Sequence, residues 1–170
     1  IKNHLTQYLA SMLGGVGINM IVDNDACNMG FMHVPVLSEN PASVRKVAFV
    51  KDKNNVAYEE IVFDDLGTIL RFKEEVLGLL KKNIFDEKIK TTIESTQSTF
   101  EEFIGRVVEC YQKGCIDMVG LLTSARCALE EDFLIDNLEV PVSWICNTEG
   151  FYHFLLHMVY EADRFAAIYN

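Results

Sequence analysis

The stretch that most constrains this chain is its last part, residues 148–169, which reads T-E-G-F-Y-H-F-L-L-H-M-V-Y-E-A-D-R-F-A-A-I-Y. Thr148 is a residue type that caps helix N-termini, and Glu149 places a carboxylate at the positive end of the helix dipole. Apolar side chains follow helical spacing on one face and also occupy the other faces. A helix this apolar around its girth is usually buried by several neighbours, so we expect it to be central to the fold.

Three polar side chains interrupt this apolar helix at intervals of four residues. His153, His157 and Glu161 therefore project from one stripe. Two histidines and a carboxylate so arranged can ligate a metal, although the H-E-x-x-H context of metalloproteases is absent. The alternatives are histidines hydrogen-bonded inside a helix interface, or an organic-ligand site that includes Tyr152 and Trp144. In each case we expect both histidines to point into an interface or pocket and not into bulk solvent.

The composition allows a sizeable core beneath an acidic surface. Of the 170 residues, 49% are hydrophobic, and the formal net charge is -10. This length fits one domain or two small, closely packed ones, and we expect a single domain spanning residues 1–170. An acidic chain is poorly suited to bind nucleic acid directly or to bind anionic membranes, because both depend on Lys and Arg. We therefore expect a small molecule or a protein as partner, and a homodimer is compatible with the same pattern.

The cysteine pattern indicates free thiols. An odd, scattered set without a C-x-x-C pair is typical of a reducing compartment, so we expect a cytoplasmic protein. No signal-peptide pattern is visible at the N-terminus. Cys27 is a poor nucleophile candidate, because Asp23 and Asp25 would raise the pKa of its thiol. The five cysteines are Cys27, Cys110, Cys115, Cys127 and Cys146.

The pattern of the first 63 residues predicts one helix followed by an antiparallel sheet. Residues 2–13 have an apolar face, and Gly14 and Gly15 would end the helix. The D-K-N-N sequence at 52–55 is typical of a hairpin turn between the two strands that flank it. The expected strands lie within residues 17–25, 29–37, 45–51 and 56–63.

The second part of the chain is predicted to be mainly helical. Asp64 and Asp65 offer an N-cap for a helix that reaches about Lys82. Asp86 could cap the next and longest helix, which Gly114 would end.

Residues 115–136 have two interpretations. With Asp117 as N-cap they form one helix, whose end carries the acidic run at 130–132. Alternatively, residues 116–122 form a buried strand parallel to a strand at 140–145. Periodicity does not separate a short buried strand from a buried helix, but the cap and the acidic run favour the helix. The sequence V-P-V-S-W-I indicates a strand in both interpretations.

These patterns together predict an α+β fold. Its first part, residues 1–63, is a helix with a small antiparallel sheet of β-hairpins. Its second part, residues 64–170, is a bundle of about four helices. The alternative is an α/β fold with the parallel pair at 116–122 and 140–145.

No catalytic constellation in the sequence is complete. The G-G-V-G stretch lacks the G-K-[ST] ending of a phosphate loop, and no G-x-S-x-G is present. The first hypothesis is therefore a non-catalytic regulatory or sensory domain that binds a small ligand or a protein partner. The second is a metal-dependent helical-bundle enzyme that uses the His153, His157 and Glu161 stripe. The third is an acidic inhibitor, of viral origin for example, of a basic nucleic-acid-binding protein. No motif identifies a family or a cofactor.

Overall fold

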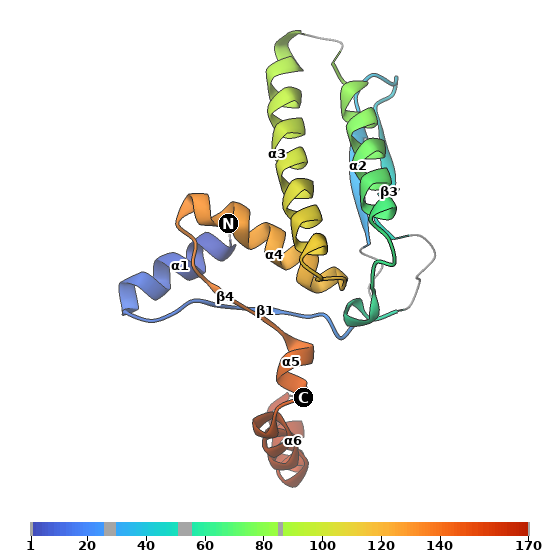
Figure 1. Cartoon of the computed structure of the whole chain (residues 1–170). Helices are drawn as coiled ribbons and strands as arrows, with labels where there is room; N and C mark the ends of the chain where they lie inside the picture. Colours follow the sequence, from blue (N-terminus) through green and yellow to red (C-terminus); the bar gives the residue numbers. More distant parts are fainter. Residues whose placement is uncertain (1, 26–29, 51–55, 85–86, 170) are drawn as a thin grey trace. The chain divides into compact units, whose positions relative to one another are not determined.

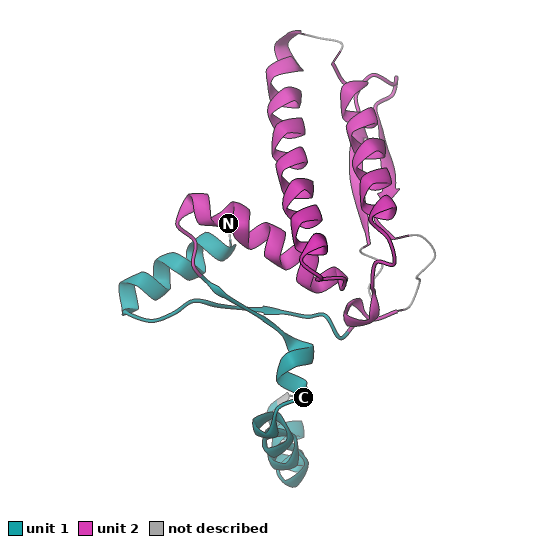
Figure 2. Ribbon diagram, in the orientation of Figure 1, with its two compact units in different colours: residues 1–24, 137–170 teal, residues 25–136 magenta. Residues whose placement is uncertain are grey.

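The computed structural model describes residues 2–25, 30–50, 56–84 and 87–169 (Figure 1). The predicted α+β class is confirmed, since the chain is about 62% helical and has an antiparallel and a parallel pair of strands. The chain divides into two compact units (Figure 2). Unit 1 consists of residues 1–24 and 137–170, and unit 2 of residues 25–136. The single-domain organisation stays a prediction.

Unit 2 packs a two-stranded antiparallel sheet against helices. Strands β2 and β3 pack on α2, which runs beside α3, and α4 packs on α3 (Figure 1). Its elements are β2 (Phe31–Val36), β3 (Ser43–Ala48), the short 3-10 helix η1 (Tyr58–Glu60), α2 (Leu66–Lys81), α3 (Glu87–Gln112), α4 (Met118–Glu130) and the 3-10 helix η2 (Glu131–Phe133).

The core of unit 2 is organised around the buried face of α2. Ile69, Phe72 and Val76 follow helical spacing and are almost fully buried. The ring of Phe49 packs edge-to-face on those of Phe72 and Phe63, with centroids 4.5 and 4.9 Å apart. Such pairs add to the stabilisation that the buried area already gives.

The predicted caps of unit 2 are confirmed where the structure describes them. The Asp65 side chain accepts a hydrogen bond from the Thr68 N–H at 3.1 Å, and Asp117 accepts one from the Gly120 N–H at 2.6 Å. Gly114, with φ of +95°, ends α3. The helical interpretation of residues 115–136 is right for residues 118–130, which form α4, and the helix ends earlier than predicted in a 3-10 turn at 131–133. The alternative strand at 116–122 is wrong. Asp86 lies outside the described residues.

The predicted hairpin between residues 45–51 and 56–63 is wrong. Strand β3 pairs with β2 instead. Residues 61–63 form backbone hydrogen bonds with the residues at the start of α4. The Phe63 N–H donates to the Ile116 carbonyl at 2.9 Å, and the Met118 N–H donates to the Ile61 carbonyl at 2.8 Å. The alternation that suggested a strand comes from burying Ile61 and Phe63 at this junction. The expected turn at 52–55 lies outside the described residues.

Unit 1 contains a two-stranded parallel sheet. Strand β1 pairs with β4, from Ile18 opposite Leu138 to Ile21 opposite Pro141. The expectation that residues 17–25 join the antiparallel sheet is therefore wrong. The elements of unit 1 are α1 (Lys2–Leu13), β1 (Ile18–Ile21), β4 (Leu138–Pro141), α5 (Val142–Cys146), α6 (Glu149–Tyr160) and α7 (Ala162–Tyr169).

The strand predicted at 140–145 ends early, because the chain turns into α5. The almost fully buried Asp23 carboxylate accepts hydrogen bonds from the N–H and the hydroxyl of Ser143, in the first turn of α5. These bonds satisfy groups that a short helix leaves unpaired at its start. Asp23 follows β1 and Ser143 follows β4, so one side chain joins the same ends of both strands.

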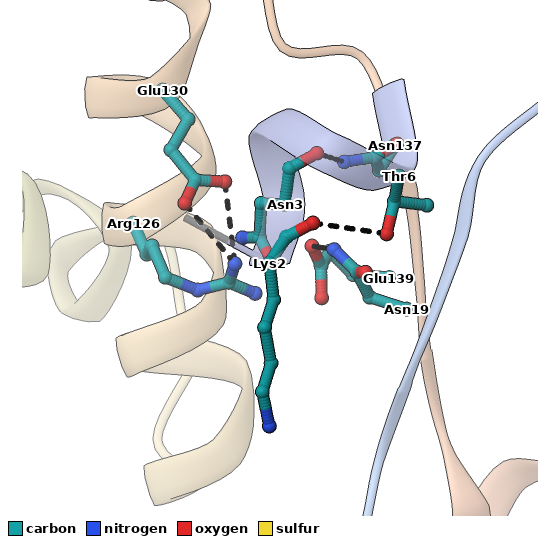
Figure 3. A network of polar contacts seen from close by, with 8 residues as sticks. All are labelled: Lys2, Asn3, Thr6, Asn19, Arg126, Glu130, Asn137 and Glu139. Atoms are coloured by element: carbon teal, nitrogen blue, oxygen red, sulfur yellow. Dashed lines mark hydrogen bonds and ion pairs between the residues drawn. The ribbon is translucent and has the colours of Figure 1, made fainter. Parts of the chain in front are cut away.

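Polar side chains also tie the sheet of unit 1 to its first helix (Figure 3). The Asn19 amide donates to the Glu139 carboxylate across the ladder at 2.7 Å. The Asn137 amide donates to the Asn3 carbonyl in α1 at 2.9 Å. Gly17 leaves room for this side chain, because a Cβ there would lie 1.9 Å from the Asn137 side-chain oxygen and would force Asn137 to shift.

The C-terminal helix differs from the expectation of a central, buried helix. Thr148 caps it as predicted, accepting from the Phe151 N–H at 3.3 Å. It is divided in two at Glu161, whose φ of -101° and ψ of 20° leave the helical range. No side chain of α6, all of whose residues are described, is buried. Its main packing is with its chain neighbours α5 and α7, so the predicted cover by several elements is wrong.

Replacing Asn83 by Ala should destabilise unit 2. The fully buried Asn83 amide donates to the Pro35 carbonyl at 2.8 Å and accepts from the Leu37 N–H at 2.7 Å. The variant leaves both backbone groups unpaired, so we expect a loss of at least about 2 kcal/mol in urea unfolding. Thr96→Ala is the control, because its 2.8 Å bond to the Thr92 carbonyl is exposed. Equal effects of the two changes would contradict the role given to Asn83.

Candidate functional site

The predicted His/Glu stripe lies on an exposed helix. The His153 side chain is 73% exposed and faces Glu149 at 3.6 Å, so it does not point into an interface as expected. His157 is also exposed, and its ring stands edge-on to Phe165 with centroids 6.3 Å apart. Glu161 lies 3.8 Å from Arg164.

The structure brings His157 and Glu161 together at one depression, but it does not bring the other candidate site residues there. These two line a small depression of about 220 Å³ together with Arg164, Phe165 and Ile168. His153, Tyr152 and Trp144 are not among its lining residues. Among the described residues, no group of three or more His, Cys, Asp or Glu side chains could hold a metal ion. The helical stripe ends where α6 ends, and Glu161 pairs with Arg164 instead.

The main feature around these residues is a set of exposed apolar side chains. Tyr160 is 85% exposed and Val159 is 72% exposed, which is unusual for large apolar residues on a helix. Trp144 in α5 is also largely exposed. We define the α6–α7 surface as Tyr152, Phe154, Leu155, Leu156, Val159, Tyr160 and Ile168, all of which are exposed.

Few charges accompany this apolar surface. Monomeric proteins rarely expose large contiguous apolar patches, and those that exist are commonly contact surfaces. None of the described helices is both long enough and apolar enough to cross a membrane. The formally charged residues of unit 1 are Lys2, Asp23, Glu139, Glu149, Glu161, Asp163 and Arg164.

Unit 2 contains a larger apolar groove that the sequence analysis missed. It measures about 480 Å³ and lies among β2, α2 and α3. A signal was present in the run S-T-Q-S-T of residues 95–99, where small hydroxyl side chains stand beside the apolar face of a long helix. Its lining residues are Met32, His33, Val34, Pro35, Val76, Leu80, Ser95, Thr96, Thr99, Phe100 and Phe103.

None of the described cysteines forms a disulfide bond with another described cysteine, as predicted. They are Cys110, Cys115, Cys127 and Cys146, whereas Cys27 lies outside the described residues. Burial, with the Asp117 carboxylate nearby, raises the pKa of the Cys115 thiol to about 11. That thiol donates a hydrogen bond to Asp117 at 3.6 Å. Cys115 is therefore a protonated structural thiol at neutral pH and not a nucleophile.

Comparison with known proteins gives no match: no family model, no curated protein and no solved structure is similar to this chain. The function is therefore inferred from the geometry of the described surfaces.

Native Cys115 should react slowly with iodoacetamide at pH 8. With a pKa of about 11, its thiolate fraction is roughly a hundredfold below that of an ordinary thiol, and reaction needs the thiolate. Mass spectrometry should show alkylation that is much slower in the folded chain than in urea. The raised pKa favours the folded state below about pH 8.5, and that contribution should decline as the pH rises toward 11. Equal rates in folded and unfolded chains would refute the assignment.

Proposed function

We propose that this chain is a non-catalytic regulatory domain of the cytoplasm, and that it binds a protein partner through the α6–α7 surface. The observation that carries the proposal is α6, an apolar helix with no buried side chain. Apolar helices are normally covered on their apolar side, because each square ångström removed from water contributes about 25 cal/mol. A partner chain that covers α6 would supply this contribution.

The residue types of this surface support protein binding. Tyr152, Tyr160 and the neighbouring Trp144 are all exposed. Tyrosine and tryptophan are enriched among the residues that dominate binding energy at interfaces. Such rings bury much area and lose little conformational freedom, and their polar atoms still find partners at a rim.

The chemistry of the surface favours a largely apolar partner. Glu149, Glu161 and Asp163 are acidic, but Glu149 faces His153 and Glu161 faces Arg164. A basic nucleic-acid-binding protein would require a strongly acidic face, and the residues of the α6–α7 surface carry no charge. A small ligand has less support here, because the depression of about 220 Å³ is smaller than typical ligand sites of about 300–1,000 Å³.

Replacing Val159 by Asp should weaken partner binding without unfolding the chain. Val159 is 72% exposed in the isolated chain, so the change should alter the free energy of unfolding by less than about 0.5 kcal/mol. A charge buried in an apolar interface should lower affinity by about tenfold or more. Proteins captured from cell extract should be purified, and their binding to each variant measured by calorimetry.

Val44→Asp is the matched control, because Val44 is 63% exposed and lies on β3 in unit 2. We expect at least one captured protein to bind the Val44→Asp control as tightly as it binds the unmodified chain, and to bind Val159→Asp weakly. Light scattering tests whether the partner is a second copy. If every captured protein binds both variants equally and the chain stays monomeric, the α6–α7 surface is not a binding surface.

A further inference from the structure

Among the described residues, strand β2 pairs with another strand along one edge only, and its other edge is open. In an antiparallel ladder, successive residues direct their backbone groups alternately toward and away from the partner strand. The Gly30 carbonyl accepts from the Phe49 N–H at 2.7 Å, so even-numbered residues face β3. The N–H and C=O groups of Phe31 and His33 therefore point away from β3. Within the described part of the chain, no hydrogen-bond partner reaches these four groups.

Asn83 shows what this edge accepts. Its side-chain amide binds the Pro35 carbonyl and the Leu37 N–H, which lie two residues apart on the outer edge of β2. One residue of an adjacent parallel strand, whose N–H and C=O point to the same side, would bind a carbonyl and an N–H spaced in this way. Asn83 thus occupies the end of the edge, while the open part at Phe31 and His33 continues along the groove lined by β2.

The rest of the groove has room for one strand and an apolar floor. Val76 and Leu80 of α2 line it, with Phe100 of α3, and all three are buried core residues. On α3 the wall consists mainly of the small side chains Ser95, Thr96 and Thr99. The sheet packs mainly on α2, and its contact with α3 is slight. A further strand beside β2 would cover this part of α3 and complete a layer of strands on a layer of helices.

We propose that this groove binds an extended peptide segment of a partner protein, which pairs with the outer edge of β2 as a third strand. The open N–H and C=O groups require a partner with the backbone spacing of a strand, and a helix uses its own backbone groups internally. A second copy of this chain does not fit the groove, because α3 forms the wall opposite β2. If the second copy paired its own β2 with this edge, its β3 would collide with α3. This binding site is separate from the α6–α7 surface.

The groove also specifies the sequence of the peptide. Alternate side chains of a strand point to the same face, so every second residue meets the apolar floor and should be apolar. Pro35 is already bound by Asn83, so the open stretch of β2 runs from Phe31 to Val34. At ~3.4 Å per residue it is about 14 Å long, which suits a core of about four residues. The lining side chains include no acidic residue, lysine or arginine. Affinity should therefore change little between low and moderate salt.

A random heptapeptide library displayed on phage, selected against the whole chain, tests the proposal. Enriched peptides should carry apolar residues at alternate positions, and methylating alternate backbone nitrogens should abolish binding. Ser95→Phe, which fills the groove, should weaken the synthetic peptide at least tenfold. Ser98→Phe is the matched control on α3, because Ser98 is exposed and does not line the groove.

Amide exchange measured by NMR locates the bound peptide. Exchange at the Phe31 and His33 N–H groups should slow at least tenfold on binding, while Met32 and Val34, which face β3, should change little. The proposal is overturned if no peptide is enriched, if binding survives Ser95→Phe, or if backbone methylation has no effect. It is also overturned if the same protection arises without peptide, from dimerisation at high concentration.

Discussion

The Asn83 side-chain amide is the interaction on which the arrangement of unit 2 depends. It stands just after α2 and holds the end of β2 by two hydrogen bonds, fully buried. A buried amide placed so specifically fixes the register between helix and strand, because any other position would leave polar groups unpaired. The direction of the β2 edge, and with it the wall of the groove, follows from this one side chain.

Local features of the fold were predictable from the sequence, and long-range pairings were not. Asp65, Asp117 and Thr148 were recognised as caps because a cap depends on residues within one turn. Residues 61–63 alternate like a strand, but nothing nearby shows that their partner is the start of α4. The pairing of β1 with β4 joins residues 120 positions apart, which no local pattern encodes.

The candidate site shows the same division between local and distant information. Apolar periodicity predicted helical structure at residues 149–160, and it also led to the expectation of burial, which depends on what surrounds the helix. His153 and His157 are both exposed because few elements pack on α6, and only His157 lines a depression. The groove forms only where three distant segments, β2, α2 and α3, come together. The small hydroxyl residues of α3 therefore did not indicate a binding groove in the sequence alone.

The parallel pairing of β1 with β4 has a consequence for the order of folding. Strand β1 is synthesised before unit 2, but its only strand partner among the described residues follows the whole of unit 2. Closing so long a loop costs more entropy than closing the short connection of the β2–β3 hairpin. On a ribosome, unit 2 can complete its core before β4 is synthesised, while Ile18 and Met20 of β1 are still unpaired. The sheet of unit 1 therefore forms after unit 2, and β1 is exposed to incorrect pairing until β4 has been synthesised.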